Sequence, residues 1–303
     1  MKYSEAIEQF VAWKGWNVKA NTMMGYSFEL RMFCLYLRDP EVERITIGDL
    51  LDYLNGMKAL GWKQNCFTHK CAYLRSFFGY LRTRGFQVLD ERLIPIPKRQ
   101  FNPPRVATPE EYRALLGVIP SGPDPRSSRN RAIINLLWDT GARIGEVLSL
   151  DLENMDYGRM RAVVRTEKSR GRRPIRDLFW TPETNANLLQ WLAKRERFRY
   201  IKDTDALFIC CAGHHSGERM RIAGMAQVLR IYSGKAKIPN LNAHSFRHHM
   251  GHSIIKQGGS TADVMNILGH SSLESSSVYT LMMNKELEER YRKFQSHGEP
   301  SPA

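Results

Sequence analysis

Residues 244–279 read HSFRHHMGHSIIKQGGSTADVMNILGHSSLESSSVY, and this stretch decides which fold the chain adopts. Its apolar spacing predicts helices over about 245–257 and 262–269. An arginine and several histidines begin the first helix, a Leu-Gly-His triplet ends the second, and a tyrosine follows nine residues later. Binding a phosphate and moving a proton use these residue types. The residues concerned are His244, Arg247, His270 and Tyr279.

A second arginine, Arg143, lies about 100 residues upstream in the segment TGARIGE, residues 140–146. Three sequence boxes thus follow one another: one around Arg143, one with His244 and Arg247, and one from His270 to Tyr279. Their order and spacing make the chain resemble the tyrosine recombinase (integrase) family from about residue 105 to its C-terminal end. In size and layout the chain is Xer-like. The resemblance implies a site-specific recombinase that cleaves and rejoins DNA, either for integration and excision of DNA or for dimer resolution.

The resemblance also implies a role for each residue of the boxes. Arg143 and Arg247 would hold the scissile phosphate, because a guanidinium stays protonated and grips two oxygens in a planar fork. His244 and His270 would donate hydrogen bonds to the same oxygens and move protons. Tyr279 would be the nucleophile, and its attack would leave a 3′-phosphotyrosyl link. Since that link keeps the energy of the broken bond, no ATP, metal or other cofactor is implied.

The leaving 5′ oxygen needs a proton, and in the family a lysine in the turn of a β-hairpin supplies it. Lys168 stands at the turn of the hairpin expected here, in a stretch where eight of the twenty residues 157–176 are basic. Glu146 follows Arg143 by one helical turn and is expected to orient it or a hairpin residue. His248, directly after Arg247, is expected to point away from the phosphate and to support the site by packing.

The predicted fold is mainly α. Residues 1–90 are expected to form an N-terminal four-helix core-binding (SAM-like) bundle that binds DNA, and the proline-rich residues 91–107 an extended linker. Residues 108–303 are expected to form a mostly α catalytic domain with a small antiparallel β-sheet. A tail helix near residues 284–295 would end the chain.

Capping residues and apolar stripes predict the elements in more detail. Thr46 and Asp49 form a capping-box pattern, and Thr108-Pro109 is a typical helix start. Residues 206–211 are apolar enough for a short buried strand. Stripes expected in the core are Met24, Phe28, Met32 and Leu35 of the second helix, Leu50, Leu51 and Leu54 of the third, and Phe67, Cys71, Leu74, Phe78 and Leu81 of the fourth.

The chain is basic throughout, with a net charge of +14. Residues 1–104 contribute +5 and residues 105–303 contribute +9, so both parts favour a polyanionic partner such as double-stranded DNA. Exchange between two duplexes implies four protomers: a homo-tetramer on two DNA sites, or a hetero-tetramer with a second recombinase. Candidate DNA contacts are Lys63, Lys70, Arg75, Arg82, Lys98, Arg99, Arg105, Arg170, Arg172 and Arg173.

Other classes of protein fit less well. No apolar run reaches the length of a membrane span, the first ten residues do not resemble a signal peptide, and five cysteines without Cys-x-x-Cys spacing indicate reduced thiols in a cytoplasmic protein. No metal site is expected. Two alternatives stay open: a type IB topoisomerase-like enzyme that relaxes DNA without exchanging partners, and a non-cleaving DNA-binding accessory protein.

Overall fold

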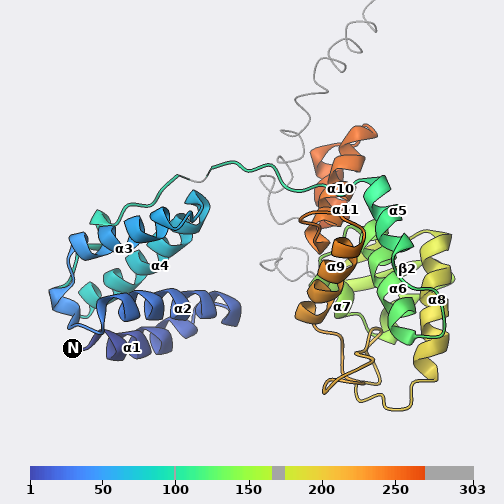
Figure 1. Ribbon diagram of the computed structural model, residues 1–303, viewed down its shortest axis with the longest axis horizontal. Helices are drawn as coiled ribbons and strands as arrows, with labels where there is room; N and C mark the ends of the chain where they lie inside the picture. The colour runs from blue at the N-terminus through green and yellow to red at the C-terminus, as the bar shows by residue number, and fades with distance from the viewer. Residues whose placement is uncertain (99, 166–174, 270–303) are drawn as a thin grey trace, which may run out of the picture. The chain divides into compact units, whose positions relative to one another are not determined.

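The computed structural model describes residues 1–98, 100–165 and 175–269. Contacts between residues divide the chain into two compact units, Met1–Asn102 and Pro103–Ala303, each with its own hydrophobic core (Figure 1). Helices dominate both units, and the strands form one small antiparallel sheet, as the sequence predicts. No helix among the described residues is long and apolar enough to cross a membrane.

The first unit is a bundle of four helices. Local signals start and end them where expected: Thr46 and Asp49 form the predicted capping box, and the α4 stripe from Phe67 to Leu81 is buried. Aromatic rings fill the core, where Phe10 packs against Phe77 and Tyr80. The elements are α1 (Tyr3–Gly15), α2 (Ala20–Leu37), η1 (Val42–Arg44), α3 (Ile47–Ala59), α4 (Gln64–Thr83) and η2 (Glu91–Leu93).

The prediction for the buried face of α2 was wrong. Met24, Phe28, Met32 and Leu35 are exposed, and the face that enters the core carries Glu29, Leu30, Phe33 and Cys34. Helix α2 is apolar on more than one side, so spacing alone fits two stripes, and packing against α1 and α4 selects one. On α3, Leu51 is likewise exposed, whereas Leu50 and Leu54 are buried as predicted.

The first part of the predicted linker packs on the bundle. The guanidinium of Arg75 donates hydrogen bonds to the carbonyls of Glu91 (3.0 Å) and Ile94 (2.6 Å), and Ile94 is fully buried. Farther along, Thr68 Oγ1 donates to the carbonyl of Pro97 at 3.0 Å. Because these bonds satisfy the polar backbone of the segment, the division between the units falls after Asn102, inside the predicted linker.

Helix α6 lies at the centre of the second unit, with α8 and α10 packed against it, and its residues Ile133, Ile134 and Leu137 are fully buried. Thr108 starts α5 as predicted, with Pro109 as its first residue, and also forms a capping box with Glu111 that the sequence did not predict. The helices are α5 (Pro109–Gly117), α6 (Pro125–Thr140), α7 (Ile144–Leu148), η3 (Leu152–Asn154), α8 (Pro182–Glu196), α9 (Ile222–Lys235), α10 (Ala243–Lys256) and α11 (Thr261–Leu268).

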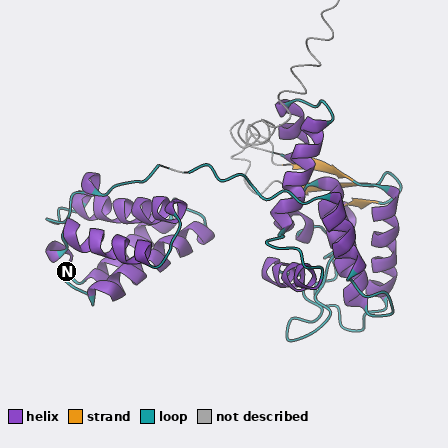
Figure 2. Cartoon of the chain, turned by 45° about the horizontal axis from the view of Figure 1, so that its top comes forward, coloured by secondary structure: helices purple, strands orange, loops and turns teal. Residues whose placement is uncertain are grey.

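The sheet of the second unit has the order β1-β2-β3 and is antiparallel throughout (Figure 2). Strands β2 and β3 are the two arms of the predicted hairpin, and Val163 pairs with Asp177. The sequence did not predict the short strand β1. The strands are β1 (Met155–Asp156), β2 (Arg161–Arg165) and β3 (Ile175–Phe179).

The strand predicted over residues 206–211 is absent from this part of the described chain. Ala206 to Ile209 are fully buried, but they form only the isolated bridges Asp151–Ala206 and Ile209–Arg219. An apolar run reports burial, whereas a strand also needs a neighbouring strand that extends alongside it.

Candidate active site

Arg143 is positioned by the first turn of helix α7. It is the N-cap residue, and its backbone N–H donates to Glu146 Oε2 at 2.8 Å while its Nη1 donates to Glu146 Oε1 at 2.9 Å. The Glu146 side chain is fully buried, whereas that of Arg143 is 15% exposed. The carboxylate therefore holds both the backbone and the guanidinium of Arg143, and leaves part of the guanidinium open to solvent.

Arg176 on strand β3 contacts the same carboxylate, with its Nη2 donating to Glu146 Oε2 at 2.8 Å. Burial by itself would raise the pKa of Glu146, but the charges and hydrogen bonds of Arg176 and Arg143 outweigh it and lower that pKa. Glu146 is therefore ionised at neutral pH. The expectation that Glu146 contacts Arg143 or a hairpin residue agrees with this geometry, since it contacts both.

Arg247 reaches from helix α10 to the segment that carries Arg143. Its Nη1 donates to the carbonyl of Gly141 at 2.9 Å and its Nη2 to the carbonyl of Leu268 at 2.8 Å. Gly141 ends α6 with a φ of +56°, and a Cβ there would lie 2.7 Å from Leu268 Cδ2 and 2.8 Å from Met250 Cβ. Only glycine allows α6, α10 and α11 to meet this closely, and their meeting lets the guanidinium of Arg247 reach the carbonyl two residues before Arg143.

His244 stands in the first turn of α10. The side chain of Asn242 caps this helix by accepting hydrogen bonds from the backbone N–H groups of His244 (2.9 Å) and Ser245 (3.2 Å). His244 is exposed, and the ring of His248, one turn along, lies edge-to-face against it with 6.1 Å between ring centroids. Burial lowers the pKa of His248 to about 4, with contributions from His244 and Arg247. His248 is therefore neutral at pH 7 and packs beside His244.

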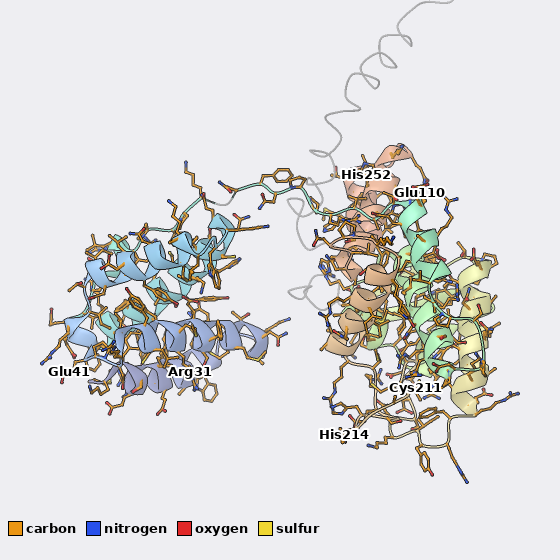
Figure 3. All side chains as sticks on the ribbon, in the orientation of Figure 1. Arg31, Glu41, Glu110, Cys211, His214 and His252 are labelled. Atoms are coloured by element: carbon orange, nitrogen blue, oxygen red, sulfur yellow. The ribbon has the colours of Figure 1, made fainter. Side chains whose placement is uncertain are left out.

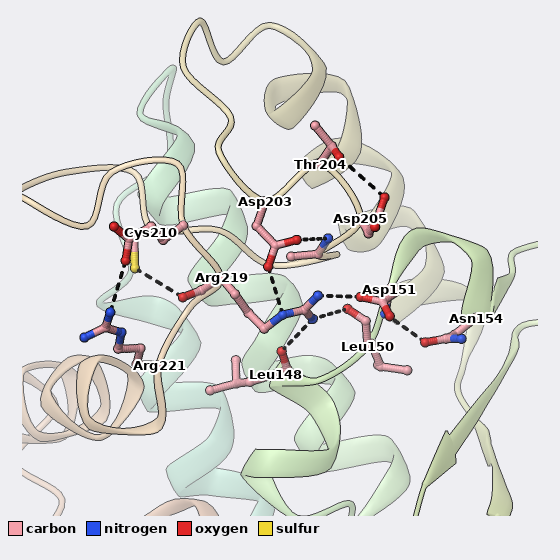
Figure 4. A network of polar contacts seen from close by, with 12 residues as sticks. Leu148, Leu150, Asp151, Asn154, Asp203, Thr204, Asp205, Cys210, Arg219 and Arg221 are labelled. Atoms are coloured by element: carbon pink, nitrogen blue, oxygen red, sulfur yellow. Dashed lines mark hydrogen bonds and ion pairs between the residues drawn. The ribbon is translucent and has the colours of Figure 1, made fainter.

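A second arginine network holds the other end of α7 (Figure 4). Arg219 Nη1 donates to the carbonyls of Leu148 (3.3 Å), the last residue of α7, and of Leu150 (3.1 Å), two residues farther along. Its charge is balanced by Asp203, 3.1 Å from Nε, and by Asp151. Cations at a helix C-terminus satisfy its unpaired carbonyls. Helix α7 is thus tied at both ends, which keeps Arg143 in place.

Among the candidate DNA contacts, Lys70 is a correction. Its side chain is buried in the bundle, where its ammonium pairs with Glu29 and lies 4.7 Å from the centroid of the Trp62 ring. Because the Lys70 ammonium is buried and paired with Glu29, it cannot contact a phosphate at the surface. The sequence did not reveal its partner, because Glu29 lies on another helix.

Most of the other described candidates also have partners within the chain. Arg75 holds the segment after the bundle, Arg82 pairs with Asp90 and Glu91, and Arg105 pairs with Glu111. Arg82 is still exposed, as are Lys63 and Lys98. The remaining predicted site residues lie outside the described residues: Arg99, Lys168, Arg170, Arg172, Arg173, His270 and Tyr279.

Arg176 is the site residue that the sequence did not single out. In β3 its side chain lies on the same face as the buried Leu178, since side chains alternate along a strand. A charged residue on an inward face needs a buried partner of opposite charge, and Glu146 is that partner. The alternation in residues 175–179 is the sequence signal that could have placed Arg176 on the inward face of the strand.

No group of three or more histidine, cysteine, aspartate or glutamate residues in the described parts of the chain could hold a metal ion. His214 lies in a loop at the far end of the second unit from His252 on α10 (Figure 3). Its neighbour His215 bonds through Nδ1 to Glu218 at 2.9 Å. These histidines belong to the loop and lie apart from Arg247.

The second unit is mostly helical, has a small antiparallel sheet, and brings the guanidinium of Arg247 to the turn that leads into Arg143. The model of the phage integrase family matches residues 105–286, more than half of the chain. The chain therefore belongs to the phage integrase family.

Individual relatives agree. The tyrosine recombinase XerC of Roseiflexus castenholzii is 27% identical over 270 residues, which cover 87% of this chain and 84% of that protein. The fold matches that of the XerH site-specific recombinase bound to a palindromic difH substrate, with a TM-score of 0.69, 20% identity, and coverage of 95% of this chain and 84% of that one. It also matches the Tn1549 transposon integrase in complex with circular intermediate DNA, with a TM-score of 0.73, 17% identity, and coverage of 92% and 94%.

The chain is thus a Xer-like tyrosine recombinase, an enzyme of site-specific DNA recombination, as the sequence predicted. The alternatives of a topoisomerase-like enzyme and of a non-cleaving accessory protein are not favoured.

Proposed function

We propose that this recombinase cleaves double-stranded DNA through Tyr279, with Arg143 and Arg247 holding the scissile phosphate. One observation carries the proposal. Arg247 donates to the carbonyl of Gly141, two residues before Arg143, so its guanidinium is fixed at the turn that leads into Arg143. Fixed positive charge at that turn stabilises the additional negative charge of a phosphorane transition state.

Each step of the proposed reaction forms one oxygen–phosphorus bond and breaks another. The Tyr279 hydroxyl gives its proton to one of the imidazoles of His244 and His270 as its oxygen attacks the phosphorus. The bond from phosphorus to the 5′ oxygen breaks, and Lys168 gives that oxygen a proton. His244 and His270 donate hydrogen bonds to the non-bridging oxygens. The 3′-phosphotyrosyl link is then attacked by the 5′-hydroxyl of a partner strand, which restores a phosphodiester and frees Tyr279.

Neighbouring side chains hold Arg143 and His244 in place. Glu146 fixes the guanidinium of Arg143 through one oxygen and receives Arg176 through the other. His248 packs against the ring of His244. Lys63, Lys98 and Arg82, which are exposed, are proposed to contact the DNA backbone, and Arg99, Arg170, Arg172 and Arg173 keep the same proposed role.

The proposed assembly has four protomers on two DNA sites, because two duplexes must exchange four strands. Identical protomers or a pair of different recombinases satisfy this geometry. Residues 1–90, 91–107 and 108–303 are proposed as DNA-binding bundle, linker and catalytic domain. Since its substrate is cellular DNA, we place the enzyme in the cytoplasm.

The decisive test is the covalent intermediate. Wild-type protein is extracted from cells under denaturing conditions, and the DNA that stays attached to it is sequenced. That sequence is then built into a duplex nicked next to the cleavage point. The wild type is expected to form a covalent protein–DNA band, because the nick lets the 5′ fragment diffuse away. Tyr279→Phe is expected to form no band while binding the duplex with unchanged affinity, because only the attacking oxygen is removed.

Tyr200→Phe is the matched control, since Tyr200 is 70% exposed and lies outside the proposed site. A band that persists in Tyr279→Phe would show that another residue is the nucleophile. Prompt relaxation of a supercoiled plasmid of random sequence by a single protomer would instead favour topoisomerase-like action.

A further inference from the structure

Arg176 touches three elements of the second unit with one side chain. It leaves strand β3, donates from Nη2 to Glu146 Oε2 on α7 at 2.8 Å, and donates from Nη1 to the carbonyl of Ile267 on α11 at 2.6 Å. Its side chain is only 8% exposed. Although it belongs to a strongly basic hairpin, Arg176 therefore faces the protein and not a phosphate at the surface.

The contact with Ile267 matters because of where α11 ends. The last carbonyls of a helix have no partner within the helix, and cations near them are stabilising. Here Ile267 O accepts from Arg176 and Leu268 O accepts from Arg247. Gly269 then ends the helix with a φ of +67°, and the next residue in the sequence is His270. Two arginines thus fix the turn from which His270 departs.

The contact with Glu146 matters because that carboxylate holds Arg143. Its Oε1 accepts from Arg143 Nη1, and its Oε2 accepts from both the Arg143 backbone N–H and Arg176 Nη2. Without Arg176, only Arg143 would hold the carboxylate, so the carboxylate could turn about its bond to the Arg143 N–H and carry the guanidinium of Arg143 with it. Arg176 therefore acts on Arg143 through Glu146 without contacting DNA.

We propose that Arg176 is a positioning residue for DNA cleavage, one that sets the orientation of Arg143 and the path of the chain into His270 at the same time. This inference rests on the roles proposed above for those two residues. It also joins the hairpin to the site, because β3 is the arm that follows the segment containing Lys168.

Two substitutions of Arg176 separate its charge from its shape. Arg176→Lys keeps a positive charge, but a compact ammonium cannot reach both Glu146 and the carbonyl of Ile267 in the planar arrangement of a guanidinium. Arg176→Met keeps most of the length and removes the charge. The matched control is Arg161→Met, on the adjacent strand β2, because Arg161 also pairs with a carboxylate, Asp177, but is 39% exposed.

Cleavage is measured with full-length protein as the single-turnover rate of covalent complex formation on the nicked duplex described above, at saturating DNA. We expect a fall of about 100-fold for Arg176→Met, about 10-fold for Arg176→Lys, and no change for Arg161→Met. The dissociation constant for the duplex should change less than about 3-fold, because Arg176 positions catalytic groups and contributes no phosphate contact.

Two further readouts distinguish positioning from a general loss of structure. In Arg176→Met the cleavage rate should fall more steeply below pH 6 than in the wild type, because burial of Glu146 is then opposed by Arg143 alone and its pKa rises. The double variant Glu146→Gln/Arg176→Met should cleave no more slowly than the slower single variant, because both changes break the same link to Arg143.

Amide hydrogen exchange gives a readout that needs no activity. Residues 261–269 should exchange faster in Arg176→Met than in the wild type, whereas α5 should not change. Wild-type cleavage rates in Arg176→Met, or multiplied losses in the double variant, would overturn the proposal. If the wild type itself forms no covalent complex, the proposed function fails instead, a result that is plainly different from equal reaction by wild type and variant.

Discussion

Among the described residues, each unit of the protein buries one acidic side chain, and the two are held differently. Glu29 in the bundle is 2% exposed and is bound by the ammonium of Lys70 and by the hydroxyl of Tyr53, 3.1 Å from Oε1. Glu146 in the second unit is fully buried and is bound by two guanidinium groups. Both acids are balanced by opposite charge, as burial requires.

The difference lies in what the partners can still do. Lys70 and Tyr53 are buried with Glu29, so the three side chains satisfy one another and link three helices, α2, α3 and α4. A guanidinium has five donors in a fixed plane, so Arg143 and Arg176 bind Glu146 and still reach other groups. The first acid stabilises a core, whereas the second orients a partly exposed cation.

The largest expected effect is a loss of cleavage rate when Glu146 is substituted, whereas substitution of Glu29 should lower stability instead. Glu146→Gln removes the negative charge that orients Arg143, so cleavage of the nicked duplex should slow by about 10²–10³-fold, or about 3–4 kcal/mol in activation free energy. Single-turnover covalent complex formation at saturating DNA measures it. Binding of the duplex should stay close to that of the wild type.

Glu29→Gln is the matched control. It leaves the Lys70 ammonium buried without a counter-charge, which should cost roughly 3 kcal/mol of unfolding free energy in urea. Folded Glu29→Gln protein should cleave at the wild-type rate, and adding Lys70→Met should restore most of the stability. An equal loss of cleavage rate in the folded Glu29→Gln and Glu146→Gln proteins would contradict the distinction between an acid that stabilises a core and one that orients Arg143.

Two glycines that end helices give a smaller, purely structural contrast. Gly141 has positive φ and close neighbours in Met250 and Leu268, whereas Gly85 has a φ of +87° and no atom near the added methyl group. Gly141→Ala should cost about 2–4 kcal/mol of unfolding free energy, from backbone strain and overpacking together. Gly85→Ala should cost about 1 kcal/mol, from strain alone. Urea unfolding followed by circular dichroism measures both, and equal losses would contradict the crowding at Gly141.

The smallest expected effect is a dependence on pH from His248. Its pKa is lowered to about 4 in the folded protein, so at pH below about 6.5 the unfolded chain binds a proton that the folded chain does not. The stability that the neutral ring provides is complete above pH 6.5 and declines as the pH falls toward 4. Wild type should lose roughly 1–2 kcal/mol more than His248→Gln between pH 6.5 and 4.5. Parallel urea curves at the two pH values test this, and identical losses would refute it.

Local signals in the sequence predicted a large part of the fold. The capping box at Thr46 begins α3 and Thr108-Pro109 begins α5 as predicted, and the single clear stripe of α4 enters the core. The same reasoning failed for α2, where two apolar stripes compete, and for residues 206–211, where burial was taken for a strand. In both cases the deciding contact comes from elsewhere in the chain.

The site divides in the same way. The relation between Arg143 and Glu146 spans three residues and follows from helical geometry, so it was predictable. The burial of Lys70 and the role of Arg176 depend on Glu29 and Glu146, which lie on other elements. No spacing rule connects those pairs before the chain has folded.

The sequence alone determined the family, the order of the boxes and the residue types at the site, because those depend on local pattern and chemical identity. The tertiary structure alone decided which cations are available for DNA and which are occupied inside the protein. The physical reason is that a buried charge takes the nearest partner in space. For Lys70 that partner is Glu29, and for Arg176 it is Glu146.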